Sequence, residues 1–118
     1  MKIDVEVLLK GTDKVVTEAV AYDGPEPQGW TDADVEAVLL STLRVFEKVL
    51  RVDSGTAFEV SLRGLSWIVT AAEGGVAIAI EIPSGAVVAG PFSADVDPLT
   101  AAIDRVMAKS RQDVETVH

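Results

Sequence analysis

Apolar residues recur at every second position through most of residues 56–90, and this alternation constrains the fold more than any other sequence feature. A period of two places alternate side chains on opposite faces of a β-strand, so each run predicts a strand with one buried face. Turn residues separate the runs, at Arg63-Gly64, Gly74-Gly75 and Pro83-Ser84-Gly85. The segment therefore predicts a β-meander with tight turns.

The turn positions also predict which residues of neighbouring strands face each other. Apolar residues would meet across every turn: Leu62–Leu65, Val60–Trp67 and Phe58–Val69 across the first, Ala71–Ile78, Val69–Ile80 and Trp67–Ile82 across the second, Ala86–Ile82 and Val88–Ile80 across the third. These pairs would then share the inner face of one sheet.

Residues 2–9 also alternate strictly, with Ile3, Val5, Val7 and Leu9 on one face, which predicts a further half-buried strand. A turn at Gly11-Thr12-Asp13 precedes a second apolar stretch, Val15 to Tyr22. That stretch also fits a short helix, so strand and helix stay open for residues 14–22. The β-branched content favours a hairpin partner for the first strand.

A long amphipathic helix is predicted over residues 31–51. Thr31 is the expected N-cap and Asp34 completes a capping box, while Trp30 and Val35 are spaced for a hydrophobic staple. One apolar stripe follows at helical spacing, with Val35, Leu39, Leu43, Phe46 and Leu50 along its edge. Thr42 lies inside this stripe and is expected to bond its own i−4 carbonyl.

A second helix is expected to begin with Asp97 as N-cap and Pro98 at its first position. The resulting order, β-β-α-β-β-β-β-α, predicts one α+β domain over residues 1–118. It would be a two-layer sandwich in which two amphipathic helices cover a mostly antiparallel sheet of five to six strands.

This element order resembles that of the profilin-like group of folds, which includes roadblock, longin, PAS and GAF domains. The resemblance concerns element order alone, so it implies an architecture and no functional residue.

Composition excludes several classes of function. Lys and Arg number 10 against 19 Asp and Glu, and a net charge of −9 would repel nucleic acid and anionic membranes. The chain has no cysteine, which removes disulfides and thiolate chemistry and fits a reducing compartment. The N-terminus has no apolar secretory signal, so we expect a cytoplasmic protein.

Chemistry-bearing motifs are scarce, and we expect no catalytic residue, metal site or cofactor. The single histidine is His118, so acid–base catalysis would have to use a carboxylate, a lysine or Tyr22. The pairs Asp32/Asp34 and Asp95/Asp97 could hold a divalent cation. Each falls at a predicted helix start, however, where acids complement the helix dipole.

The outer face of the predicted sheet carries small apolar residues where a solvated face would carry charges. The residues expected there are Ile68, Thr70, Ala77, Ala79, Val87 and Ala89, with Leu40 as an exposed apolar residue of the first helix. An ordinary sheet surface, a subunit interface and a ligand-binding surface all fit this pattern.

Three hypotheses of function remain. The favoured one is a non-catalytic protein-interaction module that forms a homodimer. The second is a small-molecule-binding or sensory domain with a pocket between sheet and helices. The third is a carboxylate-dependent enzyme, which would need convergent carboxylates in a cleft.

Overall fold

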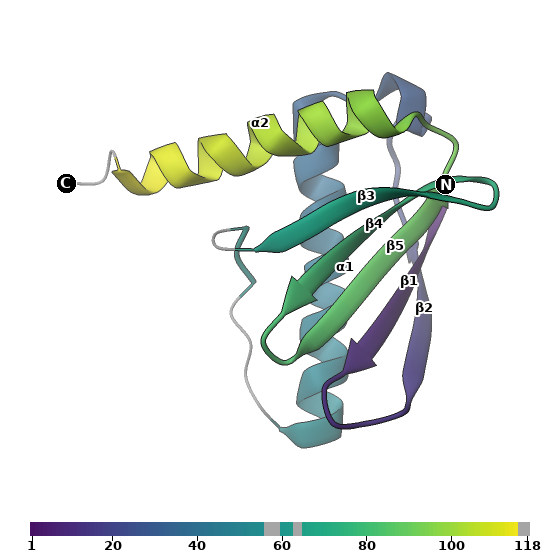
Figure 1. Ribbon diagram of the computed structural model, residues 1–118, viewed down its shortest axis with the longest axis vertical. Coiled ribbons are helices and arrows are strands. Elements are labelled where there is room, and N and C mark those ends of the chain that lie inside the picture. The colour runs from purple at the N-terminus through teal and green to yellow at the C-terminus, as the bar shows by residue number, and fades with distance from the viewer. Residues whose placement is uncertain (56–59, 63–64, 116–118) are drawn as a thin grey trace.

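The computed structural model describes residues 1–55, 60–62 and 65–115, which form two layers, an antiparallel sheet and a pair of helices (Figure 1). The elements in chain order are β1 (Lys2–Leu9), β2 (Val15–Ala21), the 3-10 turn η1 (Pro27–Gly29), α1 (Asp32–Ser54), β3 (Ser66–Ala72), β4 (Gly75–Ile82), β5 (Gly85–Phe92) and α2 (Val96–Glu115). The predicted α+β two-layer class is confirmed, and residues 15–21 are a strand.

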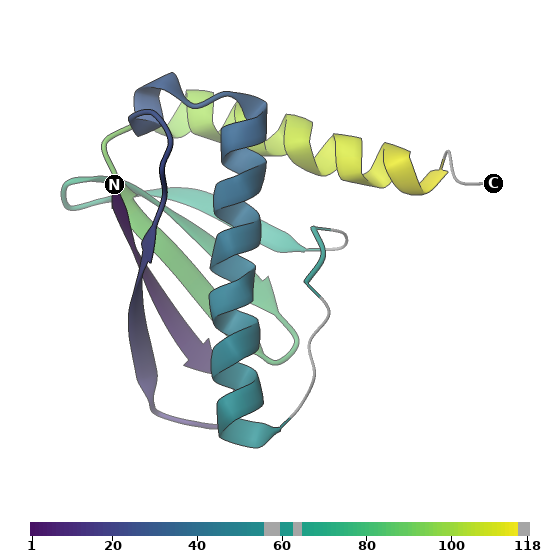
Figure 2. The same ribbon diagram turned by 180° about the vertical axis from the view of Figure 1, so that it is seen from behind.

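The sheet has the strand order β2-β1-β5-β4-β3, so the N-terminal hairpin joins the C-terminal meander through the β1–β5 pairing. From behind, in Figure 2, α1 crosses in front of the sheet, and α2 contacts both α1 and β3. We call the helix-covered side the inner face and the opposite side the outer face.

The sheet buries its inner face in the way that the alternation predicts. Every second residue of β1 is buried, from Ile3 to Leu9. Inner-face residues of β3, β4 and β5 continue this layer, among them Val69, Ile78 and Ile80. Trp67 faces inward, as the alternation predicts, but it is only half-buried because β3 is an edge strand.

The β3–β4 turn differs from the predicted one without changing the faces. Ala72 faces Gly75, so Glu73 and Gly74 form the loop, and Val69 faces Ile78 rather than Ile80. The predicted register is therefore wrong by two residues. An even offset leaves every side chain on its predicted face, because the side-chain period of a strand is two.

The β4–β5 turn is one residue shorter than predicted, and this exchanges the inward-facing and outward-facing residues of β5. Ile82 faces Gly85, so the loop is Pro83-Ser84, and Ile80 faces Val87 instead of Val88. Val87 and Ala89, which were expected on the outer face, point into the core with exposed fractions of 0% and 1%. A one-residue change in loop length moves every side chain of the strand to the other face.

The sequence predicts a strand before the Arg63-Gly64 turn, and the described part of that segment, residues 60–62, does not form one. Val60, Ser61 and Leu62 are described and belong to no strand, although Leu62 is buried. The expected turn at Arg63-Gly64, and Phe58 with its pairing to Val69, lie outside the described residues. Over the described residues the order is thus β-β-α-β-β-β-α.

Helix α1 begins as its sequence predicts. Thr31 Oγ1 accepts a hydrogen bond from the Asp34 backbone N–H at 3.2 Å, and Asp34 Oδ2 accepts from the Thr31 N–H at 2.9 Å, which completes the capping box. Thr42 donates to the Val38 carbonyl oxygen at 2.8 Å, as expected. The helix ends at Ser54, three residues beyond its predicted end, and the C-cap Gly55 has a φ of 70°, a left-handed conformation that glycine adopts without strain.

Helix α2 begins earlier than predicted. Its first residue is Val96, so Asp97 is the second helical residue rather than the N-cap, and Pro98 is the third. Proline is tolerated there, because the first N–H groups of a helix have no partner within it.

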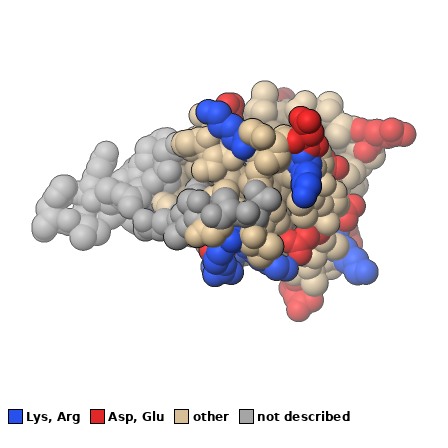
Figure 3. Space-filling model, turned by 90° about the horizontal axis from the view of Figure 1, so that it is seen from below, with Lys and Arg blue, Asp and Glu red and all other residues tan. Residues whose placement is uncertain are grey.

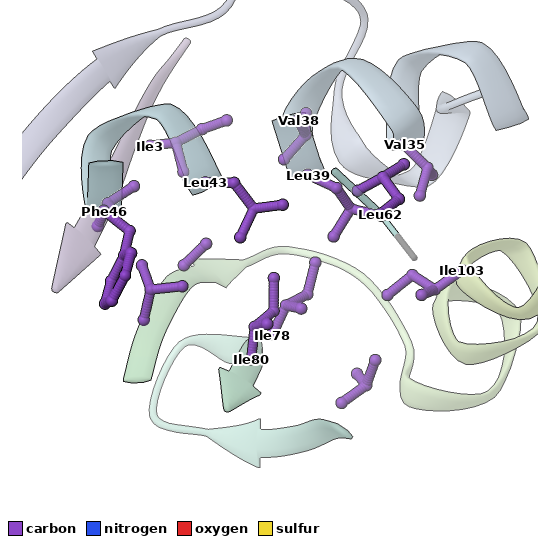
Figure 4. Close-up of a cluster of buried hydrophobic side chains, with 14 of the residues drawn as sticks. Ile3, Val35, Val38, Leu39, Leu43, Phe46, Leu62, Ile78, Ile80 and Ile103 are labelled. Carbon is purple, nitrogen blue, oxygen red and sulfur yellow. The ribbon is translucent and has the colours of Figure 1, made fainter. Parts of the chain in front are cut away.

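The core lies between α1 and the inner face of the sheet, and α2 closes one end (Figure 4). Leu43 and Phe46 of α1 point toward Ile78 and Ile80 of β4, and Ile103 of α2 approaches from the side (Figure 4). All five of these side chains have exposed fractions of 1% or less.

Leu43→Ala should therefore lower the free energy of unfolding by about 2–5 kcal/mol, because it leaves a cavity in a packed core. Val52→Ala is the matched control: Val52 is on the same helix but is 81% exposed, so its loss should change stability by less than about 0.5 kcal/mol. Urea unfolding measures both. Equal stabilities of the two variants would contradict the assignment of Leu43 to the core.

Candidate functional site

The outer face of the sheet carries a band of apolar side chains that neither helix covers. Ile68 of β3 faces Ala79 of β4, which faces Val88 of β5. Next to this row, Leu8 of β1 faces Ala86 of β5. We call the following residues the outer apolar patch: Leu8, Ile68, Ala79, Ala86 and Val88. Ala77 lies on the same face but is buried.

Four of the residues predicted for this face lie on it. Ile68 and Thr70 are exposed on β3, and each faces an alanine of β4, Ala79 and Ala77 respectively. Ile68 is 60% exposed, which is unusual for a large aliphatic side chain in a sheet. The structure brings these four residues together as the alternation predicts.

The other three predicted residues lie elsewhere. Val87 and Ala89 belong to the core, and their places on the outer face are taken by Ala86 and Val88. Leu40 lies on α1, behind the sheet, where it is half-buried and packs against the core. It is therefore not the exposed residue that its position in the helix pattern predicts.

Leu8, Ala86 and Val88 were missed at this site. Leu8 occupies the polar side of the 2–9 alternation, and an apolar residue at such a position is a signal of an apolar outer face. Ala86 and Val88 were assigned to the inner face because the turn before them was taken to be one residue longer than it is.

The patch is hollowed at its centre. A depression of about 830 Å³ has Leu8, Ile68, Ala79 and Ala86 among its lining residues. Alanines form its floor and the larger Leu8 and Ile68 lie on either side, so the curvature follows from side-chain size.

Two charged residues of opposite sign border the same depression. Lys10 follows β1 and Glu81 is on β4, so they lie on opposite sides of β5. Within the described part of the chain, neither residue forms an ion pair. The patch therefore has an apolar centre and charges of both signs at its border, where Glu6 of β1, which faces Val88, adds a second negative charge.

The Asp32/Asp34 pair is engaged in structural contacts at the start of α1. Asp34 Oδ1 accepts a hydrogen bond from the Tyr22 hydroxyl at 2.5 Å, in addition to its capping bonds. Asp32 forms a bidentate ion pair with Arg105 of α2, with N–O distances from 2.9 to 3.2 Å. These contacts tie β2 and α2 to the start of α1.

Both carboxyl groups titrate below their usual range as a result. The hydrogen bond from Tyr22, followed by the one from the Thr31 backbone, lowers the pKa of Asp34, and the same bond raises the pKa of Tyr22. The hydrogen bond from Arg105 lowers the pKa of Asp32. Carboxyls stabilised in this way remain ionised near neutral pH and are poor general acids.

Metal-binding geometry is absent from the part of the chain that the structure describes: no three acidic or imidazole side chains gather there. Over the same residues, no helix has a stretch long and apolar enough to cross a membrane. Comparison of the chain with protein-family models, curated proteins and solved structures found no match.

The lowered pKa of Asp34 predicts a loss of stability in acid. A carboxyl whose folded-state pKa is depressed stabilises the fold above its unfolded pKa, and this contribution disappears as the pH falls through the folded pKa. Asp34→Asn should therefore unfold with a shallower dependence on pH than wild type over the acid range in which aspartate titrates, from about pH 5 downward. Asp104→Asn, on the exposed side of α2, controls for the loss of one negative charge. Thermal unfolding across this range measures the slopes, and equal slopes for wild type and Asp34→Asn would contradict the assignment.

Proposed function

We propose that this chain is a non-catalytic protein-interaction module that forms a homodimer through the outer apolar patch. The observation that carries the proposal is the uncovered band of apolar side chains around Ala79, with Ile68 60% exposed beside it. Contiguous exposed apolar surface of this kind is typical of interaction sites rather than of solvated sheets.

The size of the side chains supports a flat, close contact. Alanine loses no rotamer freedom on burial, and the β-branched Ile68 and Val88 lose little, so ordering this surface costs little entropy. The hollow at Ala79 and Ala86 gives a partner's projecting side chain a place to pack.

The arrangement of charges supports a second copy of the chain as the partner. In a two-fold interface, residue i contacts residue j of the partner and residue j contacts residue i. Lys10 and Glu81 border one depression from two sides, so a two-fold axis that lies in the interface, passes between them and runs perpendicular to the line joining them would place each Lys10 near the Glu81 of the other copy. The positions of Lys10 and Glu81 are thus complementary to each other across the interface, while Glu6, which faces Val88, adds a negative charge that this pairing does not balance.

Ala79→Glu should convert the protein to a monomer, because it places a desolvated charge at the centre of the contact. Ala101→Glu introduces the same change on the exposed side of α2 and should leave the dimer intact. Light scattering at several protein concentrations gives the mass.

Association of the wild type should strengthen with added salt, which screens the repulsion between two chains of charge −9. A wild-type monomer at high concentration and moderate salt would refute the proposal.

A charge exchange tests the two-fold geometry separately. Lys10→Glu and Glu81→Lys should each weaken self-association, because like charges would then face each other in both contacts. An equimolar mixture of the two variants should associate again, since each Glu would face a Lys of the other variant. Sedimentation velocity distinguishes these cases. If the mixture were as weak as the separate variants, the pairing of Lys10 with Glu81 would be wrong.

The enzyme hypothesis receives no comparable support. The carboxylates at the start of α1, which sequence analysis singled out, are engaged by Tyr22, Thr31 and Arg105.

A further inference from the structure

A second hollow lies on the inner side of the sheet, between the edge strand β2 and the C-terminal half of α1. It encloses about 420 Å³, which is within the range of about 300–1,000 Å³ typical of small-molecule sites. Its walls combine four aliphatic residues from three elements with a few polar groups. The residues that line this β2–α1 groove are Leu9, Thr12, Lys14, Val16, Glu18, Lys48, Val49 and Val52.

The groove exists because α1 covers β1 more fully than β2. Alternate residues of β1 are fully buried under the helix, whereas the inward-facing residues of β2, Val16 among them, are only half-buried. Val52, at the end of α1, is 81% exposed beside the groove. The chain therefore leaves aliphatic surface on both walls of the groove without filling the space between them.

Charge distinguishes this groove from the rest of the molecule. Lys48 and Glu18 form an ion pair of 2.9 Å that joins α1 to β2 across it. Lys14 also lines the groove, and among the described residues it has no ion-pair partner. Two lysines against one glutamate leave the lining with a net charge of +1, on a chain whose total is −9. Figure 3 views the molecule from below and shows Lys and Arg atoms interspersed with Asp and Glu atoms.

We propose that the β2–α1 groove binds a single-chain amphiphile with one negative charge, of which a free medium-chain fatty acid is the simplest. The alkyl chain buries aliphatic surface on Val16 and Val52, and the carboxylate pairs with the ammonium group of Lys14. One carboxylate balances the net charge of the lining. This site is independent of the proposed dimer, because the groove and the outer apolar patch lie on opposite faces of the sheet.

The test uses dodecanoate below its micelle concentration and the full-length protein, with isothermal titration calorimetry as the measurement. Wild type should bind one dodecanoate per chain. Each methylene removed from the probe should weaken binding by about fourfold, because each buried CH₂ contributes a similar transfer free energy. Methyl dodecanoate, which has the same chain and no charge, should bind about tenfold more weakly.

Two variants locate the site. Val52→Asp places a negative charge at an exposed position of the groove wall, and Lys14→Gln removes the unpaired cation; each should weaken dodecanoate binding by about tenfold or more. Val15→Asp and Lys2→Gln are the matched controls, because Val15 points to the outer face and Lys2 lies at the opposite end of β1. Both controls, and Ala79→Glu, should bind as wild type does.

Three results would overturn the proposal. The first is wild-type affinity in both Val52→Asp and Lys14→Gln, with circular dichroism confirming that the variants are folded. The second is equal affinity for dodecanoate and its methyl ester, which would remove the anion from the recognition. The third is binding of several dodecanoate molecules per chain without dependence on Lys14, which would indicate detergent-like adsorption.

Discussion

The antiparallel pairing of β1 with β5 is the contact on which the rest of this structure depends. It joins the N-terminal hairpin to the C-terminal meander, and at its centre Val7 faces Val87, both with an exposed fraction of 0%. The strands come together closely at Gly85, where a Cβ atom would lie 2.1 Å from the carbonyl oxygen of Leu8. Because the side-chain period is two, the register of this pairing decides which residues meet the helices and which form the outer face.

Local patterns in the sequence predicted the elements well, because the physical causes of those elements are local. The capping box at Thr31 and Asp34, the stripe along α1 and the alternation of β1 all involve residues a few positions apart. The pairings were harder to predict, because loop length decides them. At β3–β4 the predicted offset was wrong by an even number, so Ile68, Thr70, Ala77 and Ala79 kept their faces. At β4–β5 the predicted offset was wrong by one residue, so Val87 and Ala89 lie in the core instead of on the outer face.

The composition of the outer face could thus be predicted for β3 and β4 but not for β5, and its hollow could not be predicted at all. The hollow depends on small and large side chains from four strands meeting in one place, and that requires the register of each pairing. The β2–α1 groove could not be predicted from the sequence either. Its walls come from residues as distant in sequence as Leu9 and Val52, and the space between them depends on how far α1 extends over the sheet edge.

Edge strand β2 contributes one wall of the β2–α1 groove, through Val16. Its inward-facing residues are only half-buried beneath α1, in contrast to those of β1. The Lys48–Glu18 ion pair that joins it to α1 is largely solvent-exposed, and such pairs contribute about 1 kcal/mol or less. Because β2 is only half-buried and its ion pair is weak, small outward movements of β2 require less free energy than movements of β1. An apolar occupant of the groove would supply the burial that β2 lacks, so binding there would make this edge of the sheet more rigid while the β1–β5 pairing stays unchanged.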